Sequence, residues 1–260
     1  MRETRLLMGM PITVEIVGRA PVRLLEEVFA YFAAVDARFS VFKPDSEISA
    51  LNQGRIAAGD ASPQMREVLG LAERTKRETD GYFEIRRADG SLDPCGIVKG
   101  WAIRNAADLI RRSGVRDFYV DAGGDIQTSG KNPDGEDWKI GIRNPFNERE
   151  IIKAVTPKGC GIATSGTYVR GQHIYDPRRP GQPIEDIVSL TVIAPDVLEA
   201  DRFSTAAFAM GKIGIHFIEE LPGFEGYMVD ARGIATQTSG FKAYVAPRRH
   251  HHEQHLRLCV

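Results

Sequence analysis

The sequence predicts a single α+β domain, in which mixed, largely antiparallel sheets are flanked by helices. Its strands come in hairpin-like pairs with helices between them, whereas a parallel sheet requires strict alternation of strand and helix. No internal repeat or linker divides the chain, and 260 residues, 42% of them hydrophobic, suffice for a substantial core. We therefore expect one domain over residues 1–246, followed by an unpatterned, histidine-rich tail at 247–260.

The first half of the chain is expected to hold one strand and three helices. "PITVEIVG" alternates well enough for a strand at 11–18, and apolar residues then recur at helical spacing. Pro21 suits a first helical turn, while Gly81 and Gly114 suit helix ends. Ser46 is expected to cap a short helical turn, and residues 82–97 to be extended around a turn at Asp89-Gly90. The three helices are expected at 21–40, 62–81 and 98–114.

The second half reads mainly as strands. The segment 117–130 and "WKIGIRNP" are expected to pair through a polar turn, and a further strand pair begins near 153. A β-branched strand at 189–195 precedes a helix at 196–211. There Asp196 and Glu199 stand three residues apart, as in a capping box. Beyond this helix, strand and helix alternate more weakly up to about residue 241.

Charge and cysteine content exclude several classes of partner. The 34 basic and 35 acidic residues give a net charge of −1, so neither nucleic acid nor membrane insertion is expected. Cys95, Cys160 and Cys259 are scattered and form no zinc or CxxC spacing, which is typical of reduced thiols in the cytoplasm. The N-terminus reads better as a strand than as a signal peptide. We expect a cytoplasmic protein.

A carboxylate and a hydroxyl share one face of the helix at 196–211. Asp201 and Thr205 stand at i and i+4, and oxygen-only ligands suit Mg²⁺ or Ca²⁺. The plainer alternative is that Thr205 bonds back to the carbonyl of residue 201 while Asp201 faces water. Taken alone, this pair does not decide between the two.

Three other polar, glycine-rich segments are candidates for a site. In "SLDPCGIVKGWAI", Lys99 lies at the start of a helix, where amides suit an anion, although a plain strand-to-helix turn explains it equally well. In "VDAGGDIQTSG", two aspartates bracket a stretch that fits either a close ligand contact or a bulged strand. In "GIATSGTYVRGQHIYDP", His173 is the natural acid–base candidate, or else a structural histidine.

Taken together and in order, these segments resemble the FAD:protein FMN transferase family, also called the ApbE family. The resemblance runs from residue 8 to about residue 211, and its motifs are "MGM", "FSVFKPDSEISALN", "TDGYFEI", "LDPCGIVKGWAI", "VDAGGDI", "WKIGIRNP", "ATSGTY", "HIYDP" and "ADRFSTAAFAMG". It implies that FMN passes from FAD to a threonine or serine hydroxyl of an acceptor flavoprotein, with Mg²⁺ as cofactor and AMP as leaving group.

The resemblance also implies the site residues. Mg²⁺ would be held by Asp201, Thr205 and the main-chain carbonyl of Gly96. His173, which matches a family histidine suspected of handling the acceptor's proton, and Asp201 are the expected catalytic residues. The FAD contacts are expected at Met8, Phe42, Tyr82, Phe83, Glu84, Asp93, Lys99 and Tyr175.

The chain departs from the family pattern in places. Cys95 replaces a usual glycine, Glu84 a usual aspartate, and "MGM" the usual "MGT". A long insert found in many members between "TDGYFEI" and "LDPCG" is here a short turn, which bears on the nucleotide site or on acceptor docking. Many members are exported lipoproteins, whereas this sequence shows no signal peptide or lipid-attachment cysteine.

Two other functions are alternatives to flavin transfer. FAD hydrolysis to FMN and AMP would use the same metal and nucleotide site, with water in place of the acceptor hydroxyl. A non-catalytic FAD carrier would have no need of the Asp201/Thr205 pair. The segments "TSGTY" and "TSGF" lack the alanine-hydroxyl ending of acceptor motifs, so self-flavinylation is not expected.

Overall fold

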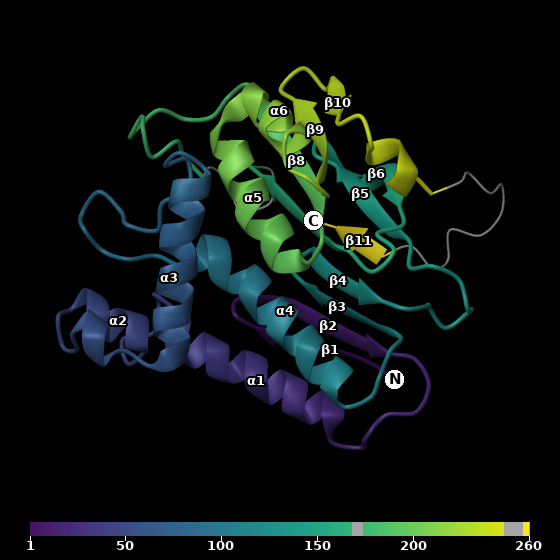
Figure 1. Cartoon of the computed structure of the whole chain (residues 1–260), viewed down its shortest axis with the longest axis horizontal. Helices are drawn as coiled ribbons and strands as arrows, with labels where there is room; N and C mark the ends of the chain where they lie inside the picture. Colours follow the sequence, from purple (N-terminus) through teal and green to yellow (C-terminus); the bar gives the residue numbers. More distant parts are fainter. Residues whose placement is uncertain (168–173, 247–256, 260) are drawn as a thin grey trace.

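The computed structural model describes residues 1–167, 174–246 and 257–259, and it arranges them in three layers (Figure 1). Helices cover one face of an eight-stranded sheet, and a three-stranded sheet packs on the other face through a separate hydrophobic cluster. The predicted α+β architecture with largely antiparallel strands is confirmed.

The large sheet has the order β1-β2-β3-β4-β7-β8-β9-β10, and all its neighbouring strands are antiparallel. The central strands are largely buried on both faces, which suits the β-branched residues that are most frequent in β8. Its strands are β1 (Arg2–Leu7), β2 (Met10–Ile16), β3 (Phe118–Ala122), β4 (Asp125–Ser129), β7 (Gly161–Gly166), β8 (Ile187–Ala194), β9 (Glu225–Asp230) and β10 (Ala235–Gln237).

The small sheet has the order β11-β5-β6 and consists of β5 (Ile140–Asn144), β6 (Asn147–Val155) and β11 (Arg257–Cys259). Strand β11 runs parallel to β5 and lies within the tail for which the sequence showed no pattern. A three-residue strand has too few positions to reveal a period of two.

The helices occupy the opposite side of the large sheet, with α4 and α5 lying across it in Figure 1. Helix α1 packs on α4 through an edge-to-face contact between Phe39 and Trp101, whose ring centroids are 5.4 Å apart. The helices are α1 (Leu24–Phe39), α2 (Glu47–Asn52), α3 (Pro63–Glu78), α4 (Cys95–Arg112), α5 (Val197–Ala209) and α6 (Gly214–Glu219), with short 3₁₀ turns at Ala58–Asp60, Gly211–Ile213 and Phe241–Tyr244.

Two segments near the predicted nucleotide side differ from expectation. The N-terminus forms a hairpin of two strands, whose tight turn places Met8 and Gly9 at φ values of 53° and 72°. Positive φ at both central positions matches the right-handed twist of a hairpin. Helix α4 begins at Cys95, earlier than predicted, because Pro94 serves as its N-cap and ends the extended segment.

Strand alternation decides which side chains of the central sheet face the helices. On β4, Ile126 enters the cluster shared with the small sheet, so its neighbours Asp125 and Gln127 point toward the helices. The Gln127 side chain there accepts a hydrogen bond of 2.9 Å from the Val197 amide at the start of α5. The candidate active site lies on this helix-facing side.

Candidate active site

Helices α4 and α5 approach each other closely at Gly100. A methyl group on Gly100 would lie 2.7 Å from Asp201 Cβ and 2.9 Å from Leu198 Cα, so only glycine fits here. The Gly100 amide donates a 2.8 Å hydrogen bond to Oδ2 of Asp201. The usual helical acceptor for this amide is the carbonyl of Gly96, four residues earlier, so the bond to Asp201 reaches outside the helix. The close approach therefore fixes the Asp201 carboxylate against the first turn of α4.

The three predicted metal donors are brought together by this packing. A methyl group on Gly96 would lie 3.5 Å from Cγ2 of Thr205, and Asp201 is one helical turn before Thr205. Asp201 is only 4% exposed, so the alternative that it faces water is wrong. The carbonyl of Asp201 accepts the Ser204 hydroxyl at 3.0 Å, while the Thr205 hydroxyl lies 3.5 Å from Ser165 Oγ. Thr205 is therefore oriented across the site.

Lys99 lies between two buried carboxylates. Its Nζ is 2.5 Å from Oδ2 of Asp125 and 4.0 Å from Oδ1 of Asp201. Burial raises the pKa of Asp201, the nearby Asp125 carboxylate raises it further, and Lys99 acts against both. With both carboxyl groups ionised, one ammonium does not balance their charge, so the donor set fits an added cation.

A third carboxyl group, Asp121, lies at the edge of this cluster. It accepts 2.8 Å hydrogen bonds from the Tyr119 hydroxyl and from the amide of Gly124. Burial raises the pKa of Asp121 to about 6 against the effect of these two bonds. Asp121 thereby orders the glycine turn that leads into Asp125.

The donors here differ in kind from the usual side-chain metal ligands. Within residues 1–167, 174–246 and 257–259, no group of three or more His, Cys, Asp or Glu side chains is placed to hold a metal ion. A site built from one carboxylate, one hydroxyl and one carbonyl is instead an all-oxygen set. Such a set suits Mg²⁺, which also keeps waters and substrate phosphate in its shell.

The predicted nucleotide residues fall into two groups by exposure. Phe83 is buried, and its ring would touch a methyl group on Gly96 at 3.3 Å, so it lies beside the donors. Phe42, 88% exposed, and Tyr175 lie at the surface, as suits aromatic rings that stack on a bound ligand. Tyr82 is half-buried, with the Arg178 guanidinium 4.5 Å from its ring centroid. Met8 packs against the core at the hairpin turn described above.

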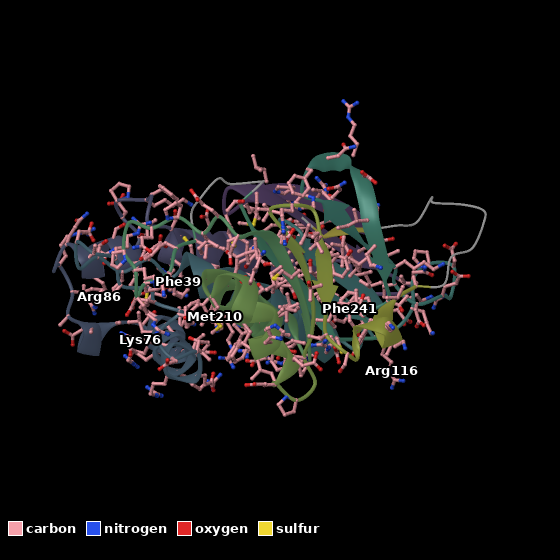
Figure 2. All side chains as sticks on the ribbon, turned by 90° about the horizontal axis from the view of Figure 1, so that it is seen from above. Phe39, Lys76, Arg86, Arg116, Met210 and Phe241 are labelled. Carbon is pink, nitrogen blue, oxygen red and sulfur yellow. The ribbon has the colours of Figure 1, made fainter. Side chains whose placement is uncertain are left out.

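Two predicted acidic contacts are already paired with basic side chains. Glu84 lies 2.5 Å from Lys76 Nζ and also accepts the backbone amide of Arg86. Figure 2 shows Lys76 and Arg86 at the same end of the molecule. Asp93 pairs with Arg87 and accepts a 3.1 Å hydrogen bond from the Cys95 amide. A ligand that used either carboxylate would share it with these partners.

The short turn before Leu92 is held by Asn52. Its side-chain amide donates to the Leu92 carbonyl at 2.9 Å and accepts from the Leu92 amide at 2.8 Å. Arg86 and Leu92 form an isolated antiparallel bridge, so residues 86–92 make a closed hairpin. The sequence correctly predicted a turn at Asp89-Gly90, and α2, which ends at Asn52, secures it.

Helix α5 is also tied to α3 through Arg202. This residue is 3% exposed, pairs with Glu78 and Glu199, and donates at 3.2 Å to the Thr75 hydroxyl. Because α3 ends shortly before Tyr82, the network joins α5 to the expected nucleotide segment.

His173, the predicted acid–base residue, lies outside the described residues. Asp125 was not among the expected site residues, although it is one of the two aspartates noted in "VDAGGDI". In the sequence, Asp125 is recognisable as the aspartate that follows the glycine pair. Its place in the site depends on the pairing of β4 with β7 beside α5. Among the described residues, no helix combines the length and apolar character needed to cross a membrane.

Comparisons with known proteins all point to one family. The family model described as "ApbE family" matches residues 8–89 and 84–228. The FAD:protein FMN transferase of Escherichia coli (strain K12) is 30% identical over 206 residues, which are 75% of this chain and 57% of that protein. The protein of that name from Klebsiella pneumoniae (strain 342) is 31% identical over 218 residues, or 80% and 59% respectively. The chain thus spans less than two thirds of these relatives' length.

Solved structures show the same fold. The flavin transferase ApbE from Vibrio cholerae superposes with a TM-score of 0.82 at 24% identity, covering 94% of this chain and 98% of that one. The ApbE protein of Thermotoga maritima gives a TM-score of 0.83 at 20% identity, with 95% and 99% covered. Since the family match covers residues 8–228, most of the chain, and the fold agrees along nearly its whole length, this chain belongs to the ApbE family.

Proposed function

We propose that this chain transfers FMN from FAD to a threonine or serine hydroxyl of an acceptor flavoprotein and releases AMP, with Mg²⁺ as cofactor. The observation that carries the proposal is the convergence of Gly96, Asp201 and Thr205 beside the partly buried Lys99. Simple FAD storage would need no all-oxygen metal set of this kind. The relatives named FAD:protein FMN transferase support the same reaction.

Three donors of this chain would hold the metal. They are the Gly96 carbonyl, Oδ1 of Asp201, which remains available beside the Gly100-bonded Oδ2, and the Thr205 hydroxyl. Mg²⁺ bound there supplies Lewis acidity that neutralises charge on the FAD diphosphate as the bond to AMP breaks.

The remaining residues would bind and orient FAD. Lys99 is placed to meet phosphate, since its ammonium lies at the same cluster as the metal donors. Phe83 would form an apolar wall next to Gly96, and Phe42 and Tyr175 would cover flavin or adenine faces from the surface. The contacts proposed for Met8, Tyr82, Glu84 and Asp93 surround this core of the site.

The acceptor hydroxyl must lose its proton when it attacks phosphorus. We assign this proton to His173, the histidine of the "HIYDP" motif, as general base. The acceptor itself would be a cytoplasmic flavoprotein with a threonine or serine flavinylation motif.

The first experiment incubates the purified protein with FAD and Mg²⁺, with and without a small acceptor domain that carries the threonine motif. AMP release and in-gel flavin fluorescence are measured together. A fluorescent acceptor band that disappears on chelation is the expected result. AMP release without a labelled band would favour FAD hydrolysis, and tight FAD binding without AMP would favour a carrier.

Asp201→Asn is the most informative variant, because it retains a carbonyl oxygen for the Gly100 amide and loses the charged metal donor. We expect it to fold and to lose AMP release. Asp137→Asn, which affects only the exposed Asp137–Lys131 pair, should behave as the wild type. Intact mass of the purified protein should show no covalent flavin.

A further inference from the structure

Asp125 is a buried carboxylate that is held from two sides near the proposed metal donors. It is fully buried, and its Oδ1 accepts a 3.1 Å hydrogen bond from the Thr164 amide on the neighbouring strand β7. Its Oδ2 lies 2.5 Å from Nζ of Lys99. Strand β4 and helix α4 are thereby joined through one carboxylate.

Lys99 has a second carboxylate within reach, that of Asp201. The distance from Nζ to Oδ1 of Asp201 is 4.0 Å. Oδ2 of Asp201 is engaged by the Gly100 amide, so Oδ1 is the oxygen left for a metal. An ammonium and a divalent cation would therefore compete for the same atom.

We propose that Asp125 is a positioning residue, which holds Lys99 away from Oδ1 of Asp201 and so reserves that oxygen for the metal. This inference rests on the proposed function, since it concerns the same metal donors. The attraction between opposite charges grows as their separation falls, so the contact at 2.5 Å outweighs the one at 4.0 Å.

The charge balance leads to the same conclusion. A divalent cation binds the ionised form of Asp201, and in that form the trio of Asp125, Lys99 and Asp201 carries a net charge of −1, which favours one more cation. If Asp125 were neutral, Lys99 and Asp201 would neutralise each other and no net charge would attract the metal. The Asp125 carboxyl group also lies within hydrogen-bonding reach of that of Asp201, and in this proposal it acts on the metal through Lys99 without being a ligand.

The test measures metal binding in the FAD-free protein, with Mn²⁺ as the probe and electron paramagnetic resonance of free Mn²⁺ as the readout. We compare wild type, Asp125→Asn, Lys99→Met and the double variant. Asp125→Asn should bind Mn²⁺ at least tenfold more weakly, because Lys99 is then free to pair with Asp201. Lys99→Met should bind at least as tightly as wild type, and the double variant should remain within threefold of Lys99→Met.

One control variant and the choice of asparagine at position 125 separate the proposed effect from a general structural change. Asp137→Asn breaks an ion pair of the same type at the surface, where Lys131 Nζ lies 2.7 Å from the carboxylate, and should leave Mn²⁺ binding unchanged. The asparagine at 125 retains an oxygen for the Thr164 amide, so the strand contact survives. If Asp125→Asn does not fold, the comparison of Lys99→Met with the double variant decides the question alone.

Three results would overturn the inference. They are unchanged Mn²⁺ affinity in Asp125→Asn, a double variant as weak as Asp125→Asn, which would make Asp125 a direct ligand, and a wild type that binds no Mn²⁺. Failure of the proposed function is a separate result. A protein that binds Mn²⁺ as described but releases no AMP from FAD would refute the transferase and leave the role of Asp125 intact.

Discussion

The contact between α4 and α5 predicts that Gly100→Ala damages both the fold and the metal site. A β-carbon at residue 100 would lie 2.7 Å from Asp201 Cβ, 2.9 Å from Leu198 Cα and 2.9 Å from the Val197 carbonyl oxygen. Two of these three atoms belong to the backbone and cannot rotate away. The two helices must therefore separate, which shifts Gly96 relative to Asp201.

The size of the effect follows from two opposing contributions. Overpacking of a filled core costs about 1–3 kcal/mol, and backbone obstacles place this case at about 3. Alanine in place of glycine inside a helix returns about 1 kcal/mol. We expect the free energy of unfolding to fall by about 2 kcal/mol, together with loss of Mn²⁺ binding.

Gly70→Ala is the matched control. Gly70 also lies inside a helix, α3, but a methyl group there meets nothing within 4 Å. The same substitution should therefore raise the free energy of unfolding by about 0.5–1 kcal/mol. Urea unfolding followed by fluorescence of the buried Trp101 and Trp138 measures both variants. A Gly100→Ala protein as stable as Gly70→Ala would refute the close-packing argument.

Three further predictions concern other parts of the structure. Hydrogen bonds from backbone amides, that of Ile234 above all, lower the pKa of Asp230 to about 2. The ionised Asp230 carboxylate therefore stabilises the fold near neutral pH, and this stabilisation is lost as the pH falls from about 4 to 2. Asp230→Asn should therefore flatten the acid side of a plot of melting temperature against pH, and an unchanged slope would contradict this. Arg202→Met should lower the free energy of unfolding by about 2 kcal/mol, which is below the roughly 3–5 kcal/mol for a broken, fully buried pair because its glutamate partners keep some solvent. Arg202→Lys should lose less in the same urea titration. Asn52→Ala should lower the free energy of unfolding by about 1–2 kcal/mol, because two hydrogen bonds to Leu92 are lost, and should weaken FAD binding in fluorescence titrations. Unaltered FAD affinity would show that the 86–92 hairpin is not part of the nucleotide site.

Local signals in the sequence predicted the elements with strong periodicity or clear caps. The helix at 196–211 is α5, and the Asp196 side chain accepts the Glu199 amide at 3.0 Å, as the spacing of the two residues indicated. The pair Asp201 and Thr205 was recognisable because i and i+4 share a helical face whatever surrounds the helix. Strand β11 was not predicted, since its pairing with β5 depends on contacts far away in the sequence.

The missing part of the site was the partner of Lys99. Position 99 at a helix start suggested an anion, and the structure supplies one from the protein itself, Asp125. No local pattern links residues 99 and 125. Their contact requires that β4 pair with β7 and that α4 cross the sheet at that point, which only tertiary structure decides.

The position of the proposed metal donors is set where α5 begins. A β-carbon on Gly161 would lie 2.0 Å from the Val197 nitrogen, just as one on Gly100 would meet Asp201 from the other side. The amide of Val197 is also held by Gln127. The first turn of α5 is thus confined between α4 and β7 by two glycines and one hydrogen bond. Because Asp201 lies one turn further along a rigid helix, small residues that touch no ligand determine where its carboxylate stands.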